Sequence, residues 1–216
     1  MSSDAKRAVV IAVDGPAASG KGTIARALAK HFGLPHMDTG LLYRAVALNL
    51  WRWGGDPGNE FEALRACNEL NLNPDDPELR SEPVSKIASI ISAYPSVRSA
   101  LLKRQRDFAE QDAGAVLDGR DIGTVIAPDA DVKLFVTASP EVRAKRRLKE
   151  LDLRGMTAHF DDVLADIHAR DQRDSSRAAA PLHPATDAIL LDTSHLDVEQ
   201  SIAEAIRLSE ERLSAH

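Results

Sequence analysis

The sequence predicts an α/β fold in which helices cover both faces of a five-stranded parallel sheet. Two observations carry this prediction. Short apolar runs alternate with longer segments of helical periodicity along the 216 residues, and the first apolar run leads directly into a glycine-rich turn and a helix. With 44% apolar residues, a chain of this length can bury well over half of the surface that its unfolded form exposes. We therefore expect one domain over residues 1–216.

The first predicted strand is apolar on both faces, which is typical of a buried parallel strand, and four further short segments are predicted as strands. The five are residues 8–13, 35–38, 115–118, 132–138 and 188–192. Because parallel strands need crossover connections, the segments between them are expected to be helices, with right-handed crossings.

The predicted helices are residues 21–32, 39–53, 95–111, 139–151, 157–174 and 196–213. The first repeats Ile24, Leu28 and Phe32 on one face and ends at Gly33. For the second helix, Thr39 is the predicted N-cap.

Residues 54–95 differ from the rest of the chain in their content of glycine and proline. Glycines and prolines interrupt this segment repeatedly, and two amphipathic stretches lie between them, near 60–70 and 83–94. This pattern predicts a small helical insertion on the sheet-based core.

Composition excludes several classes of protein. A net charge of −6 and a pI of about 5.6 argue against a general nucleic-acid binder. The single cysteine, Cys67, cannot form an internal disulfide and is expected to be a small packing residue rather than a reactive thiol. Residues 1–7 are short and polar, and no run approaches a membrane span. We expect a cytoplasmic protein, with nothing that demands more than a monomer.

A phosphate-binding loop is predicted between the first strand and the first helix. It consists of Gly15, Pro16, Ala17, Ala18, Ser19, Gly20, Lys21, Gly22 and Thr23. Its glycines let backbone N–H groups surround a phosphate at a helix N-terminus, and Lys21 can reach the β- and γ-phosphates of ATP. Gly22 stands where many such loops carry Ser or Thr. Thr23 and Asp14 are therefore the candidates for contact with Mg²⁺, directly or through water. Asp14 has an equally good alternative role, in which its carboxylate accepts hydrogen bonds from turn amides.

Three further motifs narrow the choice: DTGLLYR at 38–44, DGRDIGT at 118–124 and RDQRDSSR at 170–177. Together with the loop they resemble the bacterial cytidylate kinases, which are nucleoside monophosphate kinases. The resemblance runs from Val9 to about Ala205. It implies transfer of the γ-phosphoryl group of ATP, bound with Mg²⁺, to CMP or dCMP.

The resemblance also implies an acceptor site. Its residues are Thr39, Tyr43, Arg44, Ser89, Arg98, Asp118, Arg120, Asp121, Arg170 and Asp174. Arg44 and Arg120 would hold the acceptor phosphate, since a guanidinium pairs two phosphate oxygens. Asp121 would accept from the exocyclic amine of cytosine, where uracil offers a carbonyl instead. Alternatively, Arg44 would be an ordinary surface arginine of the helix, and Tyr43 a packing residue.

Arginines of the last third of the chain are expected near the transferred group. Arg170, Asp174 and Arg177 have a spacing that would place them on one helix face, although the same spacing also suits surface ion pairs. Residues 143–160 resemble a mobile lid, with Arg143, Arg146 and Arg147 as its cations and a basic surface patch as the alternative. Lys21, Arg120, Arg147 and Arg177 are the expected catalytic residues.

Two points stay open on the sequence alone. Residues 71–82 are short beside the insertion of many relatives, which carry a small sheet there, so the enclosure of the acceptor is uncertain from the sequence. The rival functions are a kinase for UMP, dTMP or a small non-nucleotide metabolite, and a nucleotide-gated binding protein.

Overall fold

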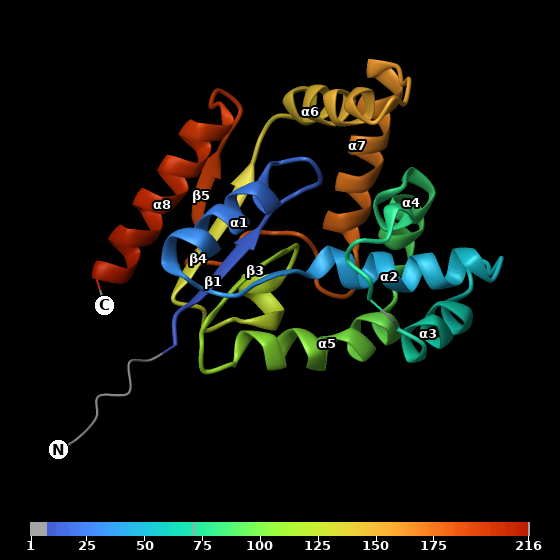
Figure 1. Cartoon of the computed structure of the whole chain (residues 1–216), viewed down its shortest axis with the longest axis horizontal. Coiled ribbons are helices and arrows are strands. Elements are labelled where there is room, and N and C mark those ends of the chain that lie inside the picture. The colour runs from blue at the N-terminus through green and yellow to red at the C-terminus, as the bar shows by residue number, and fades with distance from the viewer. Residues whose placement is uncertain (1–7, 71, 216) are drawn as a thin grey trace.

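The computed structural model describes residues 8–70 and 72–215 (Figure 1). The polar N-terminus, residues 1–7, and Asn71 lie outside the described residues. Five strands form one parallel sheet in the order β2-β3-β1-β4-β5, which confirms the predicted sheet. They are β1 (Val10–Asp14), β2 (His36–Asp38), β3 (Ala115–Gly119), β4 (Val132–Thr137) and β5 (Ile189–Asp192).

Helices cover both faces of this sheet, as predicted (Figure 1). On one face, α1 (Lys21–Phe32) and α8 (Val198–Ser214) pack on Val13 and its neighbours. On the other, α5 (Pro95–Ala109) and the π-helical turn Ile122–Ile126 pack on Ala12. Successive residues of a strand point to opposite faces. Both faces of β1 are buried, so its apolar run is uninterrupted.

The helical insertion has a core of its own beside the sheet (Figure 1). The insertion contributes α3 (Glu60–Asn68), a 3₁₀ turn at Pro77–Arg80 and α4 (Glu82–Ile91), and these pack with α2 (Thr39–Arg52) and α5 around that core. Residues 72–81 contain that turn and no strand. Val46, Leu50 and Leu79 are among the fully buried side chains of this core.

Two helices, α6 (Pro140–Leu153) and α7 (Phe160–Ser176), pack on each other through Ala144, Val163 and Ile167. In Figure 1, α6 lies higher than α4, and α7 runs down beside α4 on its left. Among the described helices, none combines the length and apolar character that crossing a bilayer requires.

Two local predictions were wrong. Asp38, not Thr39, is the N-cap of α2, and the Thr39 hydroxyl instead donates to the carbonyl oxygen of Asp118 at 2.8 Å. Arg177 does not continue the helical face of Arg170, because α7 ends at Ser176 and Arg177 has an extended ψ of 137°. A long-range hydrogen bond and a helix end decide these positions, and neither is visible in local periodicity.

Candidate active site

The loop between β1 and α1 owes its shape to two glycines. A Cβ on Gly15 would lie 2.0 Å from the carbonyl oxygen of Val136, so a side chain there would displace the backbone of β4. Gly20 has a φ of 92°, a conformation that favours glycine, and it directly precedes α1. The loop therefore turns sharply into the helix N-terminus, where backbone amides favour an anion.

Lys21 curls back over this loop. Its Nζ donates to the carbonyl oxygen of Pro16 at 3.3 Å. Burial, and then the nearby charge of Arg120, lower the pKa of Lys21 to about 8. An anion bound beside Lys21 would favour its charged form and raise that pKa again.

The carboxyl ends of β1, β2 and β3 meet at one edge of the sheet. Asp38 pairs in register with Asp118, and Asp14 with Gly119. The carboxylate of Asp118 shares a hydrogen bond of 2.7 Å with Nε2 of His36. This edge is where ligands bind in open parallel sheets.

Asp14 faces the backbone rather than the cavity. Its two carboxylate oxygens accept the N–H groups of Ile122 and Gly123, each at 2.8 Å. Burial raises the pKa of Asp14 to about 6, although those two hydrogen bonds oppose the shift. The sequence left two roles open for Asp14, contact with Mg²⁺ and acceptance of turn amides. The two hydrogen bonds correspond to the second role.

Two ion pairs between distant elements order the acceptor side. Arg120 Nε lies 2.7 Å from Asp174 Oδ2, and Arg98 pairs with Asp121 through a short contact. The guanidinium of Arg98 also lies 5.7 Å from the ring centroid of Tyr43. Burial alone would raise the pKa of Asp174, but the charge and hydrogen bond of Arg120 lower it overall. The carboxylate of Asp174 therefore stays ionised beside Arg120.

These side chains surround one cavity of about 310 Å³. It brings together most of the residues predicted from the sequence: Ala17, Ala18, Gly20, Lys21, Gly22, Thr23, Thr39, Tyr43, Arg44, Ser89, Arg98, Asp118, Arg120, Asp121, Arg147, Arg170, Asp174 and Arg177. The loop that is shaped for phosphate thus faces the carboxylates and arginines of the sheet edge across one space.

Six predicted residues lie outside the lining: Asp14, Gly15, Pro16, Ser19, Arg143 and Arg146. Arg143 is 3% exposed and pairs with Asp171, with contacts of 2.9 and 2.6 Å. Arg146 donates to the carbonyl oxygens of Ser19 and Thr193, at 3.1 and 2.7 Å. In this structure both arginines are engaged away from the cavity. Arg146 fastens α6 to the back of the loop.

The lining also contains residues that the sequence prediction missed, including Arg26, Asp38, Arg80, Ser85, Glu150 and Asp166. Asp38 lies inside a motif that had been singled out. Ser85 accepts a hydrogen bond of 2.7 Å from Nη1 of Arg44, which fixes that arginine from α4. Only the fold brings α4 to α2, so no local signal identifies Ser85.

The candidate metal contacts differ in their surroundings. Among the described residues, no group of three or more His, Cys, Asp or Glu is arranged to hold a metal ion. Thr23 lines the cavity, and its hydroxyl accepts from Arg26 Nη2 at 3.2 Å. A metal here would have few protein ligands, as is usual for Mg²⁺ bound with nucleotide phosphates.

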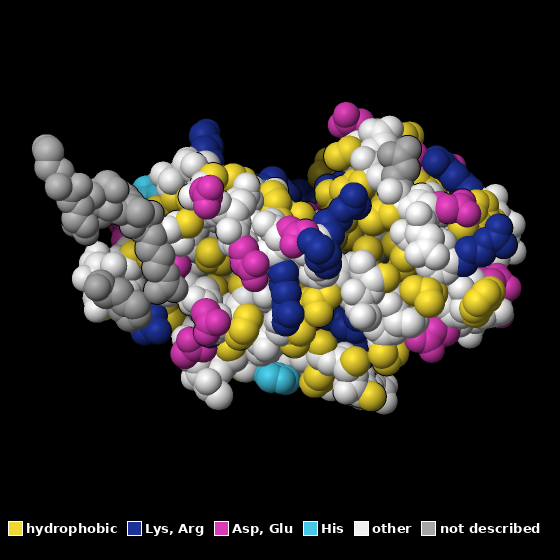
Figure 2. Space-filling view, turned by 90° about the horizontal axis from the view of Figure 1, so that it is seen from below, with side chains coloured by type: hydrophobic (Ala, Val, Ile, Leu, Met, Phe, Trp, Pro, Cys, Tyr) yellow, Lys and Arg dark blue, Asp and Glu magenta, His cyan; other side chains and the backbone are white. Residues whose placement is uncertain are grey.

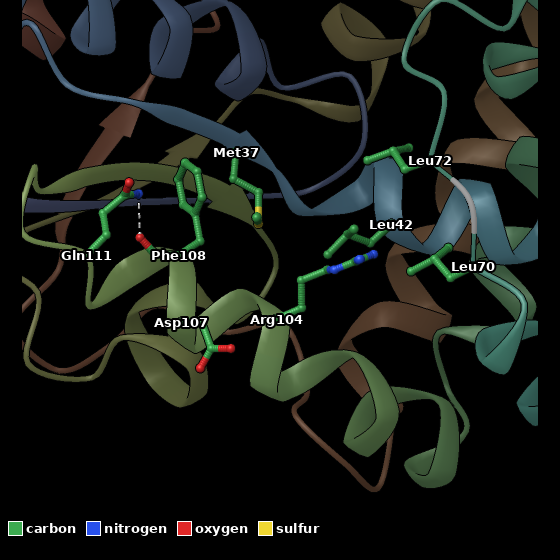
Figure 3. Close-up of a pocket in the computed structure, with 8 residues that line it drawn as sticks. All are labelled: Met37, Leu42, Leu70, Leu72, Arg104, Asp107, Phe108 and Gln111. Carbon is green, nitrogen blue, oxygen red and sulfur yellow. Dashed lines mark hydrogen bonds between the residues drawn. The ribbon is translucent and has the colours of Figure 1, made fainter.

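A second cavity, of about 570 Å³, lies between α5 and the β2–α2 segment (Figure 3). Met37, Leu42 and Phe108 give it apolar walls, and Arg104, Asp107 and Gln111 add polar groups. None of the residues predicted to bind nucleotide lines it. The second cavity thus lacks the phosphate-binding features of the first.

Figure 2 shows one face of the molecule, on which Lys and Arg side chains are interspersed with Asp, Glu and apolar ones.

Comparisons with known proteins show which family and which fold this chain shares. A family model described as cytidylate kinase matches residues 11–211. A cytidylate kinase of Azorhizobium caulinodans is 56% identical over 203 residues, covering 94% of this chain and 98% of that protein. One of Methylocella silvestris is 56% identical over 209 residues, covering 96% and 95%. A crystal structure of an uncharacterized protein from Eubacterium ventriosum shares the fold, with a TM-score of 0.54 and 15% identity over 95% of this chain and 99% of that one.

Proposed function

The chain belongs to the cytidylate kinase family, and we propose that it transfers the γ-phosphoryl group of ATP to CMP or dCMP, giving ADP and CDP or dCDP. One observation carries the proposal. Lys21 and Asp121, which stand 100 residues apart in the chain, line the same cavity. A phosphate-binding lysine and a base-reading carboxylate in one space suit a nucleotide donor and a nucleotide acceptor.

The donor side is the loop of residues 15–23. Its backbone amides and the N-terminus of α1 would bind the phosphates of ATP, with Lys21 at the β- and γ-phosphates. Burial, and then the charge of Arg120, lower the pKa of Lys21 to about 8. A bound phosphate would stabilise the charged ammonium and raise this pKa.

The acceptor side is lined by residues of the sheet edge and the insertion. Arg44 and Arg120 would hold the acceptor phosphate, and Arg170 with Asp174 the ribose. Asp121 would accept from the cytosine amine, with Ser89 and Arg98 beside it. Thr39, Tyr43 and Asp118 complete this wall of the cavity.

The chemistry needs alignment and charge neutralisation more than proton transfer. The acceptor phosphate is already an anion at neutral pH, so no dedicated base is required. We assign Lys21, Arg120, Arg147 and Arg177 to hold the two anions in line while negative charge shifts between them. Closure of the insertion, about 54–95, and of the lid, about 143–160, would exclude water as a competing acceptor.

Magnesium bound with ATP fits Thr23 better than Asp14. The Thr23 hydroxyl lies at the cavity, whereas both oxygens of Asp14 accept backbone amides. Bound there, the ion would neutralise phosphate charge. We also propose that the protein is a cytoplasmic monomer that serves pyrimidine nucleotide metabolism, the role that phosphorylation of CMP and dCMP would give it.

A coupled ADP-release assay tests this function. Purified protein receives ATP and Mg²⁺ with CMP, dCMP, UMP, AMP or dTMP in turn. We expect fast turnover with CMP and dCMP and slow turnover with the others. Equal or faster turnover with UMP or AMP would contradict the assignment of the acceptor, and ADP release without any acceptor would favour a nucleotide-gated switch.

A further inference from the structure

One acidic side chain outside the assigned residues contacts two of the site arginines. Glu82 is the first residue of α4, in the insertion. Its carboxylate pairs with Arg147 of α6 through a short contact, and its other oxygen lies 3.9 Å from Nη2 of Arg170 on α7. The side chains of the two arginines are only 16% and 14% exposed.

Each arginine also has a carboxylate on its own helix. Arg147 pairs with Glu150 at 2.9 Å, and Arg170 with Asp166 at 2.8 Å. These acids stand three and four residues away, so a helix brings them together without tertiary structure. Glu82 is different, because its contacts exist only when the insertion meets α6 and α7, which we call the lid helices.

Two further hydrogen bonds join the same elements. Arg154 Nη1 donates to the carbonyl oxygen of Arg80 at 3.0 Å, and Arg173 Nη1 donates to Ser89 Oγ at 2.5 Å. Glu82 lies between these contacts and provides the negative charge among them. The N-terminus of α4 favours that charge.

Glu82 approaches the arginines from outside the cavity. Arg147 and Arg170 line the cavity, whereas Glu82 is absent from its lining. A guanidinium has five N–H donors in a rigid fork, so it can bind one anion on one side and a second on another. Glu82 therefore occupies only some of the donors of each arginine, while Glu150 and Asp166, which line the cavity, pair with others.

We infer that Glu82 is a positioning residue for phosphoryl transfer: it holds Arg147 and Arg170 in the cavity wall and fixes the lid helices against the acceptor-side insertion. This inference rests on the proposed kinase function. Glu82 itself touches no reacting atom and acts through the two arginines.

The test uses Glu82→Gln, which keeps the shape and removes the charge. The matched control is Glu78→Gln, in the same insertion, whose carboxylate pairs with Arg52 at 2.5 Å on the exposed surface. We expect kcat with CMP to fall about tenfold in Glu82→Gln, because misplaced cations align the anions poorly, while KM for ATP changes less than about twofold. Glu78→Gln should keep the wild-type kcat.

A double-mutant cycle separates positioning from a general structural effect. If Glu82 acts through its arginines, Glu82→Gln should cost about threefold or less when introduced into Arg147→Ala. An unchanged kcat in Glu82→Gln, or a loss of the same size in both backgrounds, would overturn the inference.

A second measurement does not depend on activity. Hydrogen exchange of the nucleotide-free protein should be faster in residues 147–155 of Glu82→Gln than in the wild type or Glu78→Gln. Equal exchange in all three proteins would overturn the inference. If the wild type fails to phosphorylate CMP, the proposed function is wrong, and exchange still decides whether Glu82 holds the lid.

Discussion

The two sides of the cavity hold their cations in different ways. On the loop side, Lys21 donates to a backbone carbonyl within five residues of itself. On the lid side, Arg147 and Arg170 contact Glu82, which lies 65 and 88 residues away in the chain. The loop is therefore shaped by local backbone geometry, and the lid side by ion pairs that only the folded chain assembles.

This difference has consequences for substitution. A change on the loop side removes a group that nothing else replaces. A change on the lid side removes one member of a network, so its effect depends on the partner left behind. The following predictions test this contrast in order of decreasing effect.

The largest effect is expected at Lys21. Lys21→Ala should lower kcat about 10³-fold, because no other loop side chain supplies a positive charge to the β- and γ-phosphates. Lys30→Ala, an exposed position on the same helix, is the control and should retain wild-type activity. A loss of less than about tenfold in Lys21→Ala would show that the lid arginines alone neutralise the donor phosphates.

Among the ion pairs of α7, burial should decide how much each pair contributes to stability. Asp174→Ala leaves the guanidinium of Arg120 without its partner in a largely buried position, so we expect a loss of about 3 kcal/mol in the free energy of unfolding. Asp166→Ala, on the same helix, removes a carboxylate that is 47% exposed, and it should cost less than about 1 kcal/mol. Urea denaturation measures both, and equal losses would contradict the distinction.

A smaller, pH-dependent effect follows from Lys21. The ammonium is charged below its pKa of about 8 and neutral above it. Since kcat/KM reports the free enzyme, kcat/KM for ATP should be constant near pH 7 and fall above pH 8, approaching about tenfold per pH unit. Lys21→Ala should lose this limb, and an unchanged limb in that variant would assign it to another group.

Cys67 lies outside the cavity lining, and no effect on activity is expected there; the prediction concerns the reactivity of its thiol. Burial raises the pKa of its thiol to about 11, and its Sγ lies 3.5 Å from the carbonyl oxygen of Ala63. Alkylation by iodoacetamide at pH 7.5 should be about 100-fold slower in the folded protein than in urea, because the thiolate is scarce. Mass spectrometry measures the rate, and rapid labelling of the folded chain would contradict the prediction.

The same contrast explains what the sequence could predict. The helix that follows the loop was predicted as residues 21–32 and is found as Lys21–Phe32, because apolar periodicity and Gly33 define it locally. The five strands were predicted to within two residues at each end. For the central strands β1, β3 and β4 the reason is burial on both faces, which leaves an uninterrupted apolar run.

Side-chain direction was harder to predict. Arg143, Arg146 and Arg147 are neighbours in the sequence, yet only Arg147 lines the cavity. Arg143 faces Asp171, and Arg146 faces the back of the loop. Helical spacing predicts that the three side chains of α6 leave the helix in different directions. Only the tertiary fold decides which of these side chains faces the cavity. Arg26, Arg80 and Ser85 join the lining for the same reason.

The most direct test of the whole account compares CMP with UMP in Asp121→Asn. The wild type should prefer CMP, and the variant should lose about 10²-fold in kcat/KM for CMP and much less for UMP, because an amide can donate to the uracil carbonyl. Arg98 loses its carboxylate partner in this variant, so a thermal melt must show that the protein is still folded. A folded variant that keeps the wild-type preference for CMP would contradict the account, since Asp121 would then not read the base.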